Sequence, residues 1–273
     1  MRYKRILVQL DIDVPAVPRL TFAWDLARRF DANLIGFCAA EPRMLTPGDV
    51  DGTAVVDATE RQVAEIEDCL KKRKAEFDSL TGDSSRASWR SEVGDPTRFL
   101  ALHSRAADLV VVGETHEWTS RNRTVDPGEL ILSSGRPILF ACRYCRPMTA
   151  ENVLVAWKDT REARRAIVDA MPFLAGARQV LVATIDEGDR SIACDSTADV
   201  VSFLTRHGVK ARSKVLDVGQ ADATEALLQA SVEIGADLTI SGGYGHSRLR
   251  EWVFGGVTRN LLGDASTNRL MSN

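Results

Sequence analysis

The sequence predicts an α/β protein made of two similar halves, each with a parallel β-sheet that carries helices on both faces. Short apolar runs alternate with amphipathic helical patterns along the chain, which is typical of βαβ units. The alternation occurs twice in the same order, and an internal repeat of this kind indicates two domains of one fold. The length of 273 residues leaves each half enough chain for its own core.

The opening part of each half predicts a strand, a helix and a second strand. Each first strand is a short apolar run that ends in polar residues, as parallel strands buried on both faces do. The matching ranges are 6–11, 20–30 and 32–38 in the first half and 153–159, 161–174 and 179–185 in the second. Both halves therefore begin with the same βαβ unit.

The later part of each half repeats as well. A turn is followed by a helix and then by an apolar run that ends in glycine, either Gly113 or Gly242. In the second half, residues 227, 228, 231 and 234 fall near one helix face, as packing on a sheet requires. The matching ranges are 92–96, 97–106 and 107–113 in the first half and 217–221, 224–234 and 236–242 in the second.

The domain boundary is expected near residues 146–150, after a last strand of the first half at 137–141. We therefore predict an N-terminal domain of residues 1–147 and a C-terminal domain of residues 148–273. The first half is longer mainly because of a loop and a charged helix at about 58–80. The expected buried stripe of that helix is Val63, Ile66, Leu70 and Phe77.

Composition excludes several classes of protein. The chain is 44% hydrophobic and 27% charged with a net charge of −3, which gives no electrostatic reason to expect nucleic acid or an anionic membrane as partner. The basic residues 1–5 precede an apolar run too short for a signal peptide, and no run is long enough to span a membrane. Five scattered cysteines favour a reducing, cytoplasmic location.

The main functional signal is a glycine pattern between an expected strand and an expected helix in the second half. Glycines let backbone N–H groups approach phosphate oxygens, and a helix N-terminus adds unpaired N–H groups. His246, Arg248 and Arg250 offer further donors or positive charge. The alternative is that these glycines serve only tight turns; spacing alone does not decide, and the strand–loop–helix context favours binding. The pattern comprises Gly242, Gly245 and Gly255, then Gly256, Val257 and Thr258.

At these residues the chain resembles the universal stress protein family. Nucleotide-binding members of that family carry Gly-x2-Gly-x9-Gly and then Ser or Thr after the fourth strand of a five-stranded parallel sheet. The resemblance covers most of both halves, including Val93–Pro96, and is that of a tandem member with two fused domains. It implies a Rossmann-like, adenine nucleotide alpha hydrolase-like fold of five strands in each half, and a dimer or an intramolecular pseudo-dimer.

The resemblance also implies that the C-terminal domain binds ATP or a related adenine nucleotide, with Mg²⁺ accompanying it. In the ATP-binding branch the glycine loop holds phosphates and ribose, the first strand tip flanks the nucleotide, and the end of the second strand lies by the adenine. The expected site residues are Ala156, Trp157, Lys158, Asp159, Thr184, Gly242, Gly245, His246, Gly255, Gly256, Val257 and Thr258.

Three departures from the family pattern bear on this site. Gly256 stands where a Ser or Thr is expected, which removes one hydroxyl donor. Lys158 stands where the first strand tip usually has Asp, and it either neutralises phosphate or pairs with a nearby acid. Residues 266–273 lack the expected apolar run, so we expect an eroded last strand and a weakened edge for domain pairing.

The first half lacks the loop. Gly113 matches the first glycine, but His116 takes the second position and acidic residues at 126–129 replace the glycine pair. Acidic groups there would repel phosphate. The half nevertheless keeps an Asp at the strand tip, Asp11. We predict that it binds no ATP and acts as a structural or regulatory partner.

Other candidate sites are weaker. Cys142 and Cys145 form a single Cys-x2-Cys, which lacks the second pair that zinc would need; incidental thiols are favoured over a redox switch. Trp157 and Trp252 either wall the pocket or belong to the core. We therefore expect a stress-response regulatory protein rather than an enzyme, with at most slow ATP hydrolysis. The alternative is a tandem stress protein that has lost nucleotide binding and acts as a protein-interaction module; an enzyme on this scaffold has the weakest support.

Overall fold

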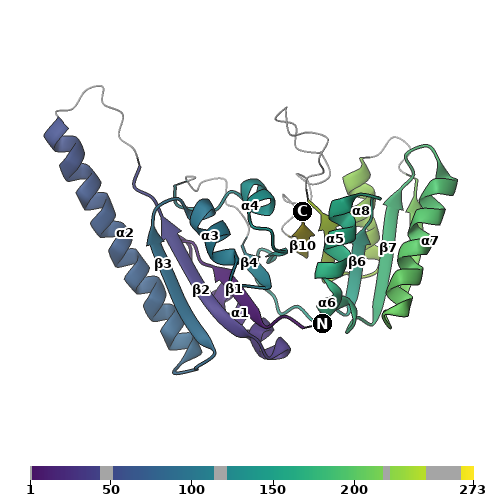
Figure 1. Cartoon of the computed structure of the whole chain (residues 1–273), viewed down its shortest axis with the longest axis horizontal. Helices are drawn as coiled ribbons and strands as arrows, with labels where there is room; N and C mark the ends of the chain where they lie inside the picture. Colours follow the sequence, from purple (N-terminus) through teal and green to yellow (C-terminus); the bar gives the residue numbers. More distant parts are fainter. Residues whose placement is uncertain (1, 44–51, 114–121, 218–221, 244–265) are drawn as a thin grey trace. The chain divides into compact units, whose positions relative to one another are not determined.

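The computed structural model describes residues 2–43, 52–113, 122–217, 222–243 and 266–273. The chain divides into two compact α/β units (Figure 1). The N-terminal unit is Tyr3–Ser134, and the C-terminal unit is Gly135–Asn273 with the first residues of the chain. The units divide earlier than the repeat boundary after residue 147, because the strand that follows Ser134 pairs within the C-terminal unit.

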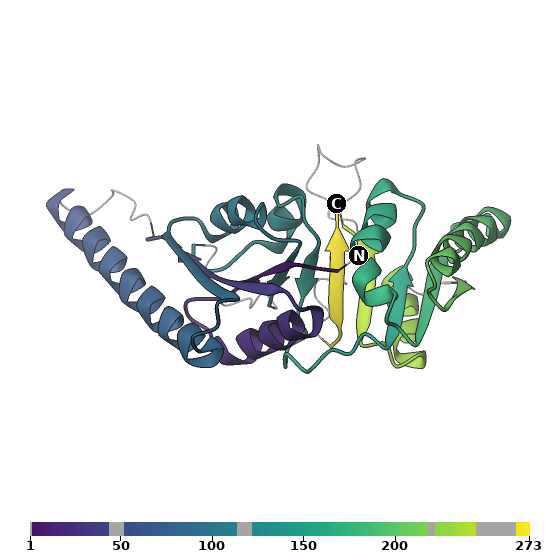
Figure 2. The same ribbon diagram turned by 60° about the horizontal axis from the view of Figure 1, so that its bottom comes forward.

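The N-terminal unit has a parallel sheet in the order β3-β2-β1-β4. α1 and α2 pack together on one face and α3 and α4 together on the other (Figure 2), as right-handed crossovers require when the strand order reverses after β3. The elements are β1 (Arg5–Gln9), α1 (Val17–Phe30), β2 (Asn33–Ala40), α2 (Gly52–Thr81), β3 (Ala87–Val93), α3 (Pro96–Ser104), β4 (Leu109–Val112) and α4 (Pro127–Ser133).

The long charged helix expected in the first half is α2. Ile66, Leu70 and Phe77 are buried as predicted, whereas Val63 is half-buried. Phe77 lies against Trp89 of β3, with ring centroids 5.4 Å apart. The apolar stripe therefore seals α2 against the β2–β3 side of the sheet.

The C-terminal unit contains the expected five-stranded parallel sheet, in the order β8-β7-β6-β9-β10. A further strand, β5, pairs antiparallel with β10. α5 contacts β9 and β10, α7 contacts β7 and β8, and α8 contacts β6 and β7. The elements are β5 (Ile138–Phe140), β6 (Asn152–Ala156), α5 (Arg161–Asp169), α6 (Met171–Leu174), β7 (Gln179–Ile185), α7 (Arg190–Arg206), β8 (Ala211–Leu216), α8 (Ala223–Glu233), β9 (Leu238–Gly242) and β10 (Asn268–Ser272).

The expectation of an eroded last strand is wrong. All five residues of β10 are buried, and the strand pairs with β9 on one side and β5 on the other. Two of its polar residues have partners in the sheet: the Asn268 carboxamide accepts from the Cys142 N–H at 3.0 Å, and the Arg269 guanidinium lies over the Phe140 ring. Internal hydrogen bonds and a cation–π contact replace the apolar run that the sequence lacks.

Matching contacts at the starts of the strands explain part of the sequence repeat. Asp108, just before β4, accepts from the backbone N–H of Arg5 at 2.9 Å. Asp237, just before β9, accepts from the backbone N–H groups of Ala150 at 2.6 Å and Asn152 at 3.3 Å. In both units this aspartate accepts from backbone N–H groups at the start of the first strand, which the hydrogen bonds between strands leave unpaired. It thereby fixes the first strand beside the fourth.

Candidate functional site

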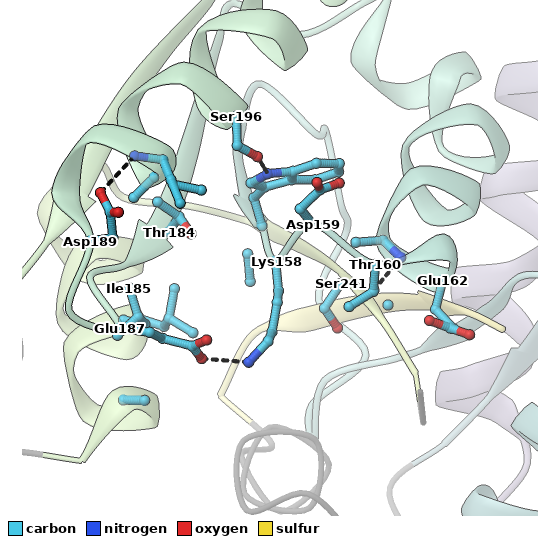
Figure 3. Close-up of a pocket in the computed structure, with 18 of the residues that line it drawn as sticks. Lys158, Asp159, Thr160, Glu162, Thr184, Ile185, Glu187, Asp189, Ser196 and Ser241 are labelled. Carbon is cyan, nitrogen blue, oxygen red and sulfur yellow. Dashed lines mark hydrogen bonds and ion pairs between the residues drawn. The ribbon is translucent and has the colours of Figure 1, made fainter. Parts of the chain in front are cut away.

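A cavity of about 450 Å³ opens at the carboxyl ends of β6, β7 and β9 in the C-terminal unit (Figure 3). Its walls come from the loops after these strands and from the first turns of α5, α7 and α8. The lining residues are Ala156, Trp157, Lys158, Asp159, Thr160, Glu162, Ala163, Thr184, Ile185, Glu187, Asp189, Ile192, Ala193, Ser196, Ala223, Leu227, Ser241, Gly242 and Gly243. The volume lies within the range of small-molecule sites.

Gly242 brings the end of β9 directly against the start of α5. A Cβ at this position would lie 2.7 Å from the backbone nitrogen of Ala163 and 3.0 Å from the Cβ of Glu162. Both contacts are shorter than van der Waals separation, so only glycine allows this approach. The Thr160 hydroxyl caps α5 by accepting from the Ala163 N–H at 3.3 Å.

The opposite wall is mainly apolar. Ile185, Ile192 and Leu227 line the cavity together with Trp157, whose side chain is largely buried. The Trp157 indole N–H donates to the Ser196 hydroxyl at 2.8 Å, which fixes the ring against α7. Trp157 therefore belongs to both the core and the cavity wall, the two roles left open by the sequence.

Charged side chains around the cavity are paired. Lys158, after β6, forms an ion pair with Glu187, after β7, and Figure 3 shows its side chain extending toward that carboxylate. Asp159 pairs with Arg164, and Asp189 accepts from two N–H groups at the start of α7. Lys158 thus pairs with an acid, as one of the two sequence hypotheses held.

The structure brings six of the expected site residues together in the cavity lining: Ala156, Trp157, Lys158, Asp159, Thr184 and Gly242. The other six, Gly245, His246, Gly255, Gly256, Val257 and Thr258, lie outside the described residues. Sequence reasoning missed the α7 side of the cavity, Ile192, Ala193 and Ser196. A short apolar and small-residue pattern after Asp189 was the available signal.

The N-terminal unit has different side chains at the matching positions. The Leu10 N–H donates to the Phe37 carbonyl just as the Trp157 N–H donates to the Ala183 carbonyl, so Leu10 is the counterpart of Trp157. The next residue in each unit then corresponds as well, which matches Asp11 with Lys158. By the same strand register Gly113 corresponds to Gly242. A Cβ on Gly113 would lie 1.9 Å from the Arg19 guanidinium, which therefore fills the space beside this glycine.

Arg19 is held there by a buried network. Its guanidinium lies 2.8 Å from the Asp11 carboxylate and donates to the Gln9 backbone and side-chain oxygens at 2.9 and 2.7 Å. Thr124 donates to Asp11 at 2.8 Å. Burial disfavours the charged carboxylate, but the Arg19 charge and the hydrogen bonds outweigh it and lower the pKa of Asp11 below its ordinary value.

An apolar cluster lies beside this network. Ile12, Cys38, Ile66 and Leu70 are buried together, and Cys38 occupies the register position of Thr184 in the C-terminal unit. Burial raises the pKa of the Cys38 thiol, which disfavours the nucleophilic thiolate. Side chains from α1 and α2 thus occupy the strand tips of the N-terminal unit.

The described part of the chain also bears on metal and thiol chemistry. No group of three His, Cys, Asp or Glu side chains gathers there as a metal site. Cys142 and Cys145 are not joined in a disulfide, and they lie in a turn closed by the Cys145 N–H to Cys142 O hydrogen bond of 2.8 Å. In the same described ranges, no helix has the length and apolarity to cross a membrane.

The comparisons with known proteins agree with this architecture. No family model matches the chain. A curated relative, a universal stress protein of Synechocystis, is 26% identical over 166 residues, which cover 57% of this chain and 54% of the relative. The match thus spans about half the length of that relative.

Solved structures cover nearly the whole chain. A universal stress protein from Archaeoglobus fulgidus matches with a TM-score of 0.69 and 13% identity, over 98% of both chains. A protein of unknown function from Pseudomonas aeruginosa PAO1 matches with a TM-score of 0.59 and 15% identity, over 99% of this chain and 92% of its own. The resemblance is therefore confirmed. The chain is similar in sequence to one universal stress protein, and it shares the α/β fold of another over 98% of both chains.

Proposed function

We propose that the protein is a tandem universal stress protein whose C-terminal unit binds ATP or a related adenine nucleotide. The observation that carries the proposal is the position of the cavity. Along the sheet β8-β7-β6-β9-β10 the strand order reverses between β6 and β9, and the cavity lies at the carboxyl ends of these two strands. Open α/β sheets bind their ligands at this switch point.

The lining supports a ligand with one flat apolar end and one polar end. Ile185, Ile192 and Trp157 supply an apolar wall for a base, and Thr184 supplies a hydroxyl beside it. Gly242, the first residue of the glycine pattern, lines the other side of the cavity against α5, so the proposal places the phosphates on that side. Mg²⁺ would accompany the phosphates and spread their charge.

The N-terminal unit is assigned a structural or regulatory role. Arg19 and Asp11 occupy the positions that a ligand would need, which supports a half without nucleotide. The proposed setting is the cytoplasm, and the assembly is a dimer or an intramolecular pseudo-dimer. Neither nucleic acid nor a membrane is a partner in this proposal. ATP turnover is at most slow, since we assign no general base among the described lining residues.

The proposal is tested by titrating the full-length protein with ATP and Mg²⁺ in a calorimeter and by analysing nucleotide released on denaturation. We expect saturable binding that Ala163→Arg abolishes, because the added side chain enters the cavity at its α5 wall. Val168→Arg, on the exposed face of the same helix, is the matched control. Absence of binding at millimolar ATP overturns the proposal and leaves the protein-interaction module as the remaining hypothesis.

A further inference from the structure

We infer that the Lys158–Glu187 ion pair selects ligands by their charge: Lys158 leaves Glu187 to bind a phosphate, and Glu187 competes with that phosphate. The inference rests on the proposed nucleotide site. The two side chains come from loops after adjacent strands and both line the cavity. A ligand in the cavity therefore meets the pair directly.

The pair is suited to exchange its partner. Both side chains are 65% exposed, and ion pairs this exposed stabilise a fold by little, so breaking this one costs little. A phosphate offers Lys158 more negative charge and several acceptor oxygens. Lys158 can thus move from a carboxylate to a ligand phosphate without loss to the core.

The remaining charges make the exchange selective. The described lining contains four carboxylates, on Asp159, Glu162, Glu187 and Asp189, and one lysine. Asp159 keeps Arg164, Glu162 keeps Arg161, and Asp189 keeps the α7 N–H groups when a ligand binds. Only Glu187 loses its cation, so it repels the incoming phosphate. An uncharged nucleoside leaves every pair intact and avoids this cost.

The experiment compares adenosine, AMP and ATP on the full-length protein by calorimetry. We expect Glu187→Gln to tighten AMP and ATP about tenfold relative to adenosine, and Lys158→Gln to weaken them about tenfold, with adenosine changed little in both. Lys214→Gln and Glu233→Gln are matched controls, since this exposed pair, 2.7 Å apart, lies outside the cavity lining. Thermal unfolding of each variant checks the fold.

The outcomes separate the two proposals. If the wild-type protein binds none of the three ligands, the nucleotide-site proposal fails. If it binds them and the ratio of AMP to adenosine affinity is the same in wild type, Glu187→Gln and Lys158→Gln, the charge-selection inference is overturned while the site stands. An equal shift in the Lys214→Gln control also overturns it, because net charge alone would then explain the change.

Discussion

The carboxyl edges of the two sheets have the same strand register but opposite contents. In the C-terminal unit the edge opens into a cavity of about 450 Å³. In the N-terminal unit the matching positions hold a buried Arg19–Asp11 ion pair with Gln9 and Thr124. The comparison shows that one repeated scaffold can either leave a cavity at this edge or fill the same place with its own side chains.

Three corresponding positions account for the difference. Gln9 matches Ala156 and Asp11 matches Lys158 by strand register. Arg19 matches Ala163, because each is the third residue after a helix N-cap and each lies against the glycine that ends the fourth strand. A small residue on α5 leaves the cavity open, whereas a long cation on α1 needs a buried acid beside it.

The largest effect is expected when the buried pair is broken. Arg19→Ala leaves the Asp11 carboxylate buried without its cation, which should lower the stability of the N-terminal unit by about 3–5 kcal/mol. Chemical denaturation, with hydrogen exchange of the β1 and β4 amides as the readout, measures this loss of stability. Arg164→Ala is the matched control, since that exposed arginine of α5 should cost at most about 1 kcal/mol. Equal losses in both variants would contradict a structural role for the Arg19 network.

Converting the C-terminal edge toward the N-terminal one should abolish binding. Ala163→Arg places an arginine where Arg19 lies in the other unit, and combining it with Lys158→Asp supplies the matching acid. We expect ATP affinity to fall at least about a hundredfold, or about 2.7 kcal/mol. Calorimetric titration measures the loss. Binding that survives in the double variant would show that the ligand lies elsewhere.

Acid should weaken the N-terminal unit through Asp11. The pKa of Asp11 is lowered in the folded protein, so its contribution is complete above the unfolded pKa of about 4 and is lost as pH falls through the lower folded value. Between pH 6 and 2 the free energy of unfolding should therefore fall less in Asp11→Asn than in wild type, although the variant is already less stable than wild type at pH 6. If stability falls with pH by the same amount in wild type and in Asp11→Asn, titration of Asp11 does not contribute to the acid sensitivity.

The smallest effect is expected at the wall of the cavity. Ser196→Ala removes the acceptor of the partly buried Trp157 indole N–H, which should cost about 1 kcal/mol and shift the tryptophan emission. Thr205→Ala on the exposed part of α7 is the control, since its hydroxyl donates to the Val201 carbonyl of its own helix at 2.8 Å. Thermal unfolding of both variants measures the difference in stability loss. Equal losses would show that the hydrogen bond to Ser196 does not hold the Trp157 ring in place.

Much of the fold follows from the sequence because strands buried on both faces are short apolar runs. β7 occupies the range 179–185 that the sequence predicts, and β1, β6 and β9 lie within a few residues of theirs. β8 (Ala211–Leu216) was missed because it is an edge strand with Arg212 and Ser213 exposed to solvent. α7 was missed because its apolar face is interrupted by Asp195 and Ser196.

The site was only partly predictable, since it depends on contacts between distant residues. The strand tips at Ala156–Asp159 and Thr184 and the glycine at Gly242 meet in one cavity, as the family resemblance implied. The ion pair of Lys158 with Glu187 and the filling of the other unit by Arg19 depend on side-chain directions that no spacing reveals. Aligning the two repeats residue by residue, Arg19 against Ala163, was the signal that could have exposed the difference.

The most direct test of this account is the number of nucleotides bound per chain and their location. Calorimetry of the full-length protein with ATP and Mg²⁺, repeated with Ala163→Arg and with Arg19→Ala below its unfolding temperature, measures both. The account predicts one ATP per chain, lost in Ala163→Arg and retained in Arg19→Ala. Two ATP per chain, or one ATP that survives Ala163→Arg, would contradict it.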